Sequence, residues 1–464
     1  METKQESKLN CRVILFPQPY IGHLTPMLNL GNALYSKGFS VTIIQTRFNS
    51  LNPSEHPNFS FHYIEDPMSK DAAPWSGTLR TIVLLNESCL GGFRDCLSRI
   101  LEDASVKKET VACLIADPMW AFVGSVADEF NLPRLALRTG GLLALILYDS
   151  LSLLRDKGYF QESEQEAAVV EIPPLKVKDL PSEEYHETMT LMAKGTKSYS
   201  QGIICNSFKE LDGTILDRVR KTLRSTPIFP IGPLHKYAST SLASIITPDQ
   251  STITWLNTQA PNSVLYVSFG TLATLSKEEF LEVAWGLANS EQPFLWAALP
   301  RLINGLKTND ALFSDDFLEA VKDRSHIIAW APQKEVLAHP AVGGFWTHCG
   351  WNSTIESICE GVPMICLPFF GDQKMNARHL SDVLKVALQL EKGINRHEIE
   401  RTIRRLMVEK EGEELRKRSA SLKLVAEQCI EEGGSSHESL DQLTSHILSY
   451  CGVEKMTVHN HLKK

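Results

Sequence analysis

The sequence predicts an α/β protein built from two doubly wound domains. Short apolar runs alternate with segments of helical periodicity, a break rich in proline, serine and threonine interrupts the alternation near the middle, and the alternation then restarts. Alternation of this kind indicates parallel sheets joined by right-handed crossovers. The apolar runs lack polar alternation, which is typical of strands in a sheet covered by helices on both faces.

The first strand and helix are the clearest elements of the first half. Residues 11–16, CRVILF, form a compact buried strand that ends at the Pro-Gln-Pro of residues 17–19. Apolar residues then recur at three- and four-residue spacing to about Lys37, Gly38 ends this helix, and FSVTIIQT begins a second strand. Further strands of the first half are predicted at 112–116, 134–137 and 202–206.

The break between the halves predicts a linker between domains. Pro227, Pro230 and Pro233 come close together and precede Ser/Thr-rich sequence, a composition typical of linkers. The predicted boundaries are 1–237 for the first domain, 238–252 for the linker, 253–435 for the second domain, and 436–464 for a terminal helix and tail whose helix packs back on the first domain. Strands of the second half are predicted at 263–269, 293–299, 326–330, 343–348 and 362–368.

Composition excludes several classes of protein. With 43% hydrophobic and 22% charged residues, the 464-residue chain is not globally disordered, and its net charge of −8 provides no basic field for nucleic acid or an anionic membrane. The ten cysteines contain no C-x-x-C spacing and match neither a zinc site nor a disulfide framework. The polar start METKQESKLN lacks the apolar core of a signal peptide, and the longest apolar stretch, 142–148, is too short to span a bilayer. We therefore expect a reduced, cytoplasmic protein with no nucleic-acid partner and no membrane insertion.

The most informative segment is 330–373. GGFWTH reads as a strand, CGW as a turn, and NSTIESICEG as a helix that Gly361 and Pro363 close. A helix that starts directly after a strand presents free backbone N–H groups and a positive dipole end, which suits an anion. No Lys or Arg occurs from residue 335 to 373, so a phosphate here depends on helix amides, hydroxyls and His348. The alternative is a well-capped helix with a purely structural role.

Glu356 has two possible roles. Ser353 and Glu356 have the spacing of a capping box, in which the carboxylate closes back on the start of the helix. In a nucleotide pocket, an acidic residue at such a place accepts hydrogen bonds from the two hydroxyls of a ribose. The sequence leaves both roles open.

The segment resembles the PSPG box, the donor-binding segment of plant UDP-dependent glycosyltransferases. The resemblance continues outside the box, from about Cys11 to Tyr450, in the PQPYIGHLTPML start, CLIADPMW, SVLYVSFGT and FLW. It implies the GT-B architecture, two Rossmann-like domains facing across a cleft, with acceptor binding in the first and UDP-sugar binding in the second. The matching box residues are Trp330, Pro332, Gln333, His339, HCGWNS at 348–353, Glu356, Gly361-Val362-Pro363, Pro368, Asp372 and Gln373.

The resemblance also implies which part of the UDP-sugar donor each residue binds. Trp330 stacks on the uracil, Ala331 and Gln333 fix the base and ribose, and Glu356 binds the ribose hydroxyls. In this family, Gln at the last box position accompanies glucose, so Gln373 favours UDP-glucose as co-substrate. The diphosphate is assigned to His348, Asn352, Ser353 and Thr271, and the sugar to Trp351, Asp372, Gln373 and Thr139.

His23 and Asp117 are the candidate catalytic residues. His23 lies in the loop after the first strand and Asp117 ends the strand at 112–116, so both belong to the carboxyl edge of one sheet. A lone His is more often structural, and Asp before Pro often caps a helix, here one starting near Met119. The resemblance instead makes His23 the general base and Asp117 the residue that orients it. Direct attack opposite UDP then inverts the anomeric centre and gives a β-glucoside, with no metal and no cofactor beyond the co-substrate.

The acceptor site is the least determined part of the chain. The first domain supplies a largely apolar lining, although apolar residues at helical spacing are usually plain core. The expected acceptor is a small lipophilic plant metabolite with a hydroxyl or carboxyl group, such as a terpenoid or phenolic, and the expected enzyme is a monomer. The candidate acceptor residues are Ile21, Leu85, Trp120, Leu143, Ile146, Phe370 and Gly371.

Two other functions compete with glucosyl transfer. A sugar-nucleotide epimerase of similar fold needs neither an acceptor pocket nor this box. A catalytically silent binder of sugar nucleotide or metabolite should have lost His23 or Asp117, and both are present.

Overall fold

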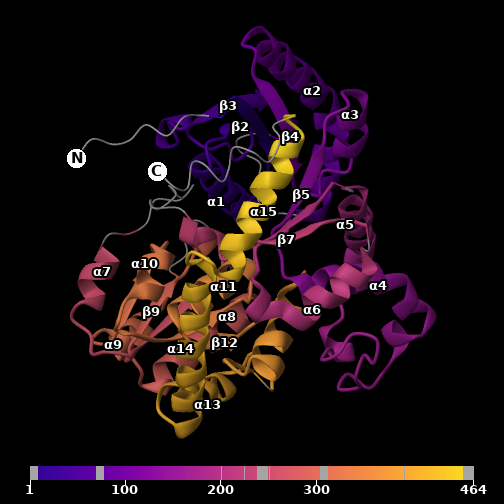
Figure 1. The fold of residues 1–464 in the computed structure, drawn as a ribbon. Helices are drawn as coiled ribbons and strands as arrows, with labels where there is room; N and C mark the ends of the chain where they lie inside the picture. Colours follow the sequence, from indigo (N-terminus) through magenta and orange to yellow (C-terminus); the bar gives the residue numbers. More distant parts are fainter. Residues whose placement is uncertain are drawn as a thin grey trace. The chain divides into compact units, whose positions relative to one another are not determined.

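A computed structural model of the chain describes residues 9–68, 78–199, 201–223, 225–237, 249, 251–303, 312–390 and 392–452. The chain divides into two compact units. The first comprises Met1–Ser152, Ser182–Ile245 and Cys429–Lys464, and the second comprises Leu153–Pro181 and Ile246–Gln428. Each unit contains one sheet (Figure 1).

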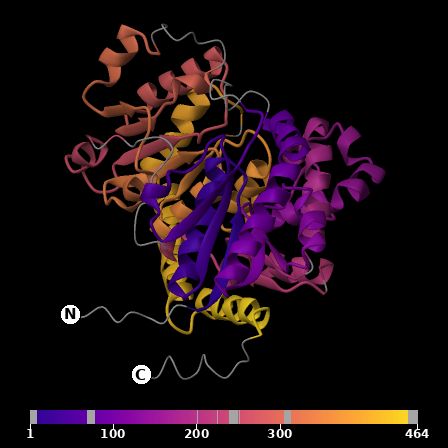
Figure 2. The ribbon, with the colours of Figure 1, turned by 90° about the horizontal axis from the view of Figure 1, so that it is seen from above.

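The sheet of the first unit is parallel throughout. Its order among the described residues is β3-β2-β1-β4-β5-β6-β7, and Figure 2 shows its first strands, in indigo, lying side by side. The two central strands are almost entirely buried, which agrees with their continuous apolar sequences. The strands are β1 (Cys11–Phe16), β2 (Ser40–Thr46), β3 (Phe59–Ile64), β4 (Thr110–Ala116), β5 (Arg134–Arg138), β6 (Ile203–Cys205) and β7 (Ile228–Pro230).

The last helix of the chain completes the core of the first unit. Leu440, Leu443 and Ile447 of this helix, α15 (Ser435–Ser449), join the cluster of buried residues around β1 and β4. The Ser436 hydroxyl donates a hydrogen bond to the Gly232 carbonyl at 2.5 Å. The other helices of this unit are α1 (Ile21–Ser36), α2 (Thr78–Val106), α3 (Val123–Glu129), α5 (His186–Ser198) and α6 (Lys209–Thr222), while α4 (Leu142–Asp156) runs across the division into units.

A disulfide joins Cys11, the first residue of β1, to Cys451, just beyond α15. The expectation of a fully reduced chain is therefore wrong for this pair. The two cysteines are 440 positions apart, and only the return of α15 to the first sheet brings them together, so no local spacing announces the bond. The other eight cysteines are buried and form no disulfide.

The sheet of the second unit is also parallel, with the order β10-β9-β8-β11-β12-β13 among the described residues. A separate apolar cluster, centred on Val267, Trp296 and Trp346, fills its core. The strands are β8 (Val264–Ser268), β9 (Phe294–Ala297), β10 (Ser325–Ile328), β11 (Val342–Thr347), β12 (Met364–Cys366) and β13 (Ala387–Gln389). The helices are α7 (Ser251–Leu256), α8 (Lys277–Ser290), α9 (Asp315–Val321), α10 (Gln333–Ala338), α11 (Trp351–Glu360), α12 (Gln373–Arg378), α13 (Arg396–Met407) and α14 (Lys410–Ile430), the last of which ends two residues past the division.

The boundaries of the units are less simple than a linear division of the sequence. The segment Leu153–Pro181 belongs to the second unit, although it precedes the strands β6 and β7 of the first. Most of the predicted linker 238–252 lies outside the described residues, and its last two residues begin α7. The extents predicted for the two domains remain predictions.

Candidate functional site

Four of the candidate residues follow the strands at which the strand order of each sheet reverses. In the first sheet, β1 and β4 are neighbours, with Phe16 opposite Ala116, so the loops that follow them leave the sheet side by side. In the second sheet, β8 and β11 are neighbours, with Ser268 opposite Thr347. Ligands of doubly wound sheets bind outside the carboxyl ends of the strands at such reversals. His23 and Asp117 follow the first pair of strands, and Thr271 and His348 follow the second.

The first unit brings His23 and Asp117 into direct contact. Nδ1 of His23, in the first turn of α1, lies 2.5 Å from Oδ2 of Asp117. The Asp117 side chain is almost wholly buried, whereas the His23 side chain is 24% exposed. A buried carboxylate on Nδ1 leaves Nε2 as the ring nitrogen that can accept a proton from outside.

The capping role that the sequence left open for Asp117 exists alongside this contact. Its second oxygen, Oδ1, accepts a hydrogen bond from the Met119 backbone at 3.0 Å, which stabilises the turn after β4. The helix that follows, α3, begins only at Val123, so the carboxylate caps a turn rather than a helix. The Thr139 hydroxyl lies 3.1 Å from Nδ1 of His23, in addition to the sugar role that the resemblance implies for this residue.

Several candidate acceptor residues have the surroundings of core residues. Leu85 is 0% exposed and Trp120 is 1% exposed. Trp120 stacks on Phe16 at a centroid distance of 4.5 Å, and its Nε1 donates to the Pro17 carbonyl at 3.1 Å. These contacts match the packing alternative that the sequence left open. Leu143 and Ile146 are also buried, whereas Ile21, Phe370 and Gly371 are partly exposed.

In the second unit, a tight turn delivers the start of α11 directly after β11. Cys349 adopts a left-handed backbone with φ 63°, and Gly350 is the N-cap of α11, which begins at Trp351. Because Gly350 has no side chain to occupy the first amides, Trp351, Asn352 and Ser353 present backbone N–H groups at the positive end of the helix dipole. This arrangement has the geometry that the predicted anion site requires, and anion binding there remains a prediction.

His348 packs into space that two glycines leave open. A Cβ at Gly270 would lie 2.8 Å from the His348 ring, and one at Gly350 would lie 2.4 Å from its Nε2. Burial lowers the pKa of His348 to about 4, so the side chain is neutral at pH 7 when no ligand is bound. A diphosphate bound at this place would therefore meet a neutral imidazole. The sequence predicts that Gly350 allows close approach of a ligand. The structure adds a second reason for glycine at this position, because a side chain there would collide with the His348 ring.

A second group of residues forms the nucleoside end of the candidate site. Nε2 of Gln333, the first residue of α10, donates to Oε2 of Glu356 at 2.7 Å and lies 3.0 Å from the Ser353 hydroxyl. The Tyr266 hydroxyl donates to Oε1 of Gln333 at 3.3 Å. Trp330, which is partly exposed, and the buried Ala331 precede α10 in the chain.

The structure excludes one of the two roles of Glu356. A capping box requires Ser353 at the N-cap, but Gly350 occupies that position and the helix has no side-chain cap. Glu356 therefore lies one turn into α11, where its carboxylate contacts Gln333. The capping alternative is wrong, and the carboxylate is placed among polar groups as a nucleotide pocket requires.

The predicted sugar end of the candidate site is the start of α12. Asp372 is its N-cap, and Oδ2 of Asp372 accepts from Nδ2 of Asn376 at 3.1 Å. Oε1 of Gln373 accepts from the backbone N–H groups of Phe369 and Phe370 at 2.8 and 3.1 Å. The carbonyl end of the Gln373 amide is thereby fixed.

Sequence reasoning missed Tyr266, Asn376 and Gly270 as parts of this site. Nδ2 of Asn376 donates to the Cys349 carbonyl at 3.0 Å and so ties α12 to the turn before α11. Tyr266 lies inside an apolar strand, where nothing in the sequence separates a functional hydroxyl from a core ring. Gly270 follows the strand SVLYVSF directly, and a glycine at the carboxyl end of a strand was the available signal.

We predict that Glu356→Gln weakens UDP binding about tenfold to a hundredfold, the equivalent of ~1.5–3 kcal/mol for hydrogen bonds to a charged acceptor. Titration calorimetry with UDP measures the loss. Binding of 2′,3′-dideoxy-UDP, which lacks the hydroxyls in question, should be nearly the same in both proteins. Glu360→Gln, a change on the same helix, is the matched control. Equal loss of UDP and dideoxy-UDP would contradict a ribose role.

Within the described ranges, no cluster of three or more His, Cys, Asp or Glu side chains is arranged to hold a metal ion. Over the same ranges, none of the helices combines the length and apolarity needed to cross a membrane.

Comparison with known proteins identifies the family. Residues 240–416 match the family described as UDP-glucoronosyl and UDP-glucosyl transferase, and residues 10–236 match the glycosyltransferase N-terminal domain. UDP-glycosyltransferase 76B1 of Arabidopsis thaliana is 43% identical over 457 residues, covering 97% of this chain and 100% of that protein. A flavonol 3-O-glucosyltransferase of the same plant is 39% identical over 454 residues, covering 96% and 98%.

Solved structures agree with this identification. The structure of Phytolacca americana UGT2 complexed with UDP-2fluoro-glucose and pterostilbene superposes with a TM-score of 0.79 at 27% identity, over 94% of this chain and 99% of that one. The predicted fold class is confirmed, since the two parallel-sheet α/β units are the Rossmann-like domains of a GT-B glycosyltransferase. The chain belongs to the plant UDP-glycosyltransferase family.

Proposed function

We propose that the protein transfers glucose from UDP-glucose to a hydroxyl or carboxyl group of a small lipophilic plant metabolite, with inversion to a β-glucoside. The observation that carries the proposal is the 2.5 Å contact between Nδ1 of His23 and the buried carboxylate of Asp117 at the strand-order reversal of the first sheet. A binding protein has no need to hold an exposed imidazole in this way.

The chemical step follows from that contact. Asp117 accepts a hydrogen bond from Nδ1–H of His23, so Nε2 takes the proton of the acceptor O–H as its oxygen attacks the anomeric carbon. The bond from that carbon to the UDP oxygen breaks on the opposite face, and the electron pair leaves with UDP. The imidazolium that forms is stabilised by the buried carboxylate at 2.5 Å. The α-linked donor thereby becomes a β-linked product.

The second unit suits the leaving group. The amides at the start of α11 and the hydroxyls of Ser353 and Thr271 provide neutral donors for the diphosphate, and Glu356 is placed for the ribose. Gln373 as the sugar contact favours glucose. The Phytolacca americana structure, which contains UDP-2fluoro-glucose, supports a glucosyl donor.

The acceptor class rests on the relatives and on the apolar content of the first unit. The Phytolacca americana structure contains pterostilbene, and the 39% identical Arabidopsis thaliana relative acts on a flavonol. Phenolics are therefore the first acceptors to try, followed by terpenoids. We further propose a metal-free, monomeric enzyme in the cytoplasm.

The test is incubation of the protein with UDP-glucose, UDP-galactose or UDP-glucuronate and a panel of phenolic and terpenoid acceptors. Mass spectrometry should find a hexose added to at least one acceptor, fastest with UDP-glucose, and NMR of the product should find a β-linkage. Turnover should be unchanged by EDTA.

Other outcomes point to the competing functions. Conversion of UDP-glucose to another UDP-hexose without an acceptor indicates an epimerase. Tight binding of UDP-glucose with no product across the whole panel indicates a silent binder.

A further inference from the structure

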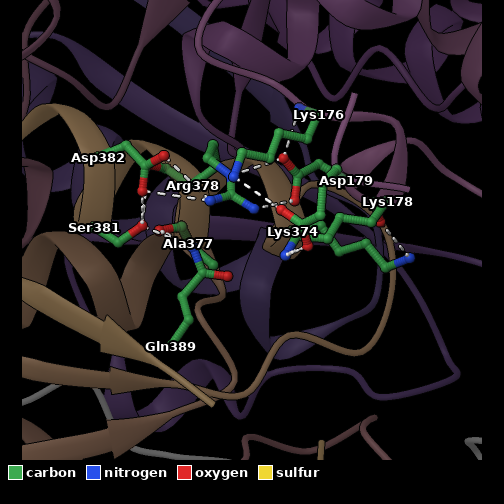
Figure 3. Close-up of polar contacts among 10 residues, drawn as sticks. Lys176, Lys178, Asp179, Lys374, Ala377, Arg378, Ser381, Asp382 and Gln389 are labelled. Carbon is green, nitrogen blue, oxygen red and sulfur yellow. Dashed lines mark hydrogen bonds and ion pairs between the residues drawn. The ribbon is translucent and has the colours of Figure 1, made fainter. Parts of the chain in front are cut away.

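A buried ion pair fastens the segment Leu153–Pro181 to α12 within the second unit (Figure 3). Nε of Arg378 donates to Oδ2 of Asp179 at 2.8 Å, and Nη2 donates to Oδ1 at 3.1 Å. The two residues are 5% and 4% exposed. Two parallel bonds between a guanidinium and a carboxylate fix direction as well as distance, which a single contact or a lysine cannot do.

Asp179 and Arg378 each make a further contact outside the ion pair. Asp179 ends a short 3₁₀ helix, Val177–Asp179, and its Oδ2 also accepts from the Lys176 backbone at 2.9 Å. Nη1 of Arg378 lies 3.2 Å from Oδ2 of Asp382 on the turn that follows α12. Figure 3 shows the guanidinium between these two carboxylates. The ion pair is therefore a rigid connection and not a loose surface contact.

The connection bears on the proposed sugar contacts, because Arg378 is the last residue of α12 and Gln373 is the first. At 1.5 Å of rise per residue, this helix is only about 8 Å long. A short, regular helix moves as one body, so a shift of Arg378 displaces Gln373 and its neighbour Asp372. Asn376 ties the helix to the turn before α11. The ion pair with Asp179, together with the hydrogen bond from Nζ of Lys374 to the Lys178 carbonyl at 3.3 Å, ties it to the segment Leu153–Pro181.

We propose that Asp179 and Arg378 are positioning residues for the donor sugar, which they act on through Asp372 and Gln373. This inference rests on the proposed function. A segment from the first half of the sequence thus sets the selectivity of a site built by the second half. The nucleoside end is anchored elsewhere, on α10 and α11, and should not depend on the pair.

The test measures, in the same variants, how well the sugar part and the nucleoside part of the donor are bound. Asp179→Asn removes the carboxylate, and Asp179→Leu with Arg378→Met replaces the whole pair by apolar side chains of similar size, which commonly preserves stability. We expect KM for UDP-glucose to rise about tenfold to a hundredfold, since displacements of about 1 Å have such effects. The preference for UDP-glucose over UDP-galactose should shrink, while Kd for UDP alone stays within about twofold.

A purely structural role predicts a different result. In that case the variants melt at lower temperature but keep the parent KM and sugar preference when assayed well below the melting transition. Glu282→Gln, which breaks the Glu282–Arg396 pair between α8 and α13 in the same unit, is the matched control and should keep both. Unchanged KM and preference in the double variant overturn the inference.

The proposed function and the positioning role can be disproved separately. If the parent protein transfers no sugar from UDP-glucose, the proposed function is wrong. If the parent transfers glucose with normal selectivity and both variants do the same, only the positioning role is wrong.

Discussion

His23→Ala should lower kcat for glucosyl transfer by about 10²–10⁴-fold, the range that a positioned general base contributes. The imidazole is the group at the carboxyl end of β1 whose Nδ1 is engaged at 2.5 Å by a buried carboxylate, which leaves Nε2 for the acceptor proton. Without it the acceptor hydroxyl must attack while still protonated. Rates of product formation with a saturating phenolic acceptor and UDP-glucose, followed by mass spectrometry, measure the loss.

Binding of UDP provides the internal control for this variant. The residues proposed for UDP lie in the second unit, so Kd for UDP should be unchanged within about twofold. His437→Ala changes another histidine of the first unit, on α15, and should keep full activity. Turnover of His23→Ala equal to the parent would rule out the base assignment, and loss of UDP binding would indicate a folding defect instead.

Asp117→Asn should have nearly as large an effect, about 10²–10⁴-fold on kcat, by reversing the tautomer of His23. In the parent, Oδ1 accepts from the Met119 backbone and Oδ2 faces Nδ1 of the imidazole. An asparagine that keeps the Met119 hydrogen bond turns its NH₂ group toward Nδ1. The imidazole then carries its own proton on Nε2, where it cannot accept another.

Two measurements separate this effect from a loss of fold. Imidazole ¹⁵N chemical shifts of His23 report the tautomer directly and should move from the Nδ1–H to the Nε2–H form. The melting temperature should change little, because the turn after β4 keeps its hydrogen bond. Glu129→Gln, which removes a charge from an exposed ion pair with Arg94 in the same unit, is the control for charge. An active Asp117→Asn enzyme with the original tautomer contradicts the orienting role.

The sequence alone was sufficient to predict the strands that directly precede His23, Asp117, Thr271 and His348. The strands β1, β4, β8 and β11 are continuous apolar runs, and such runs identify central parallel strands because both of their faces are buried. The helical spacing that follows each run then places His23 and His348 at carboxyl ends. What sequence reasoning missed are three strands at sheet edges. Of these, β3 (Phe59–Ile64) is fully buried only at its two end residues, and β7 and β13 are three residues long.

Long-range contacts were beyond the reach of local patterns. The ion pair of Asp179 with Arg378 joins residues 199 positions apart, and an aspartate after two lysines reads as a solvated surface turn. The tie between Cys11 and Cys451 is hidden in the same way. Leu85 and Trp120 show the converse problem, because an apolar residue near a ligand site and one in the core have the same sequence signal.

The return of α15 to the first sheet has a consequence for synthesis of the protein in the cell. The apolar core around β1 includes Leu440, Leu443 and Ile447, which are translated after the entire second unit. The first unit to emerge from the ribosome is thus the one that cannot complete its core until α15 has been translated. The second unit has no such dependence, so during translation it should become resistant to protease before the first unit does, reversing the usual order in which nascent domains fold.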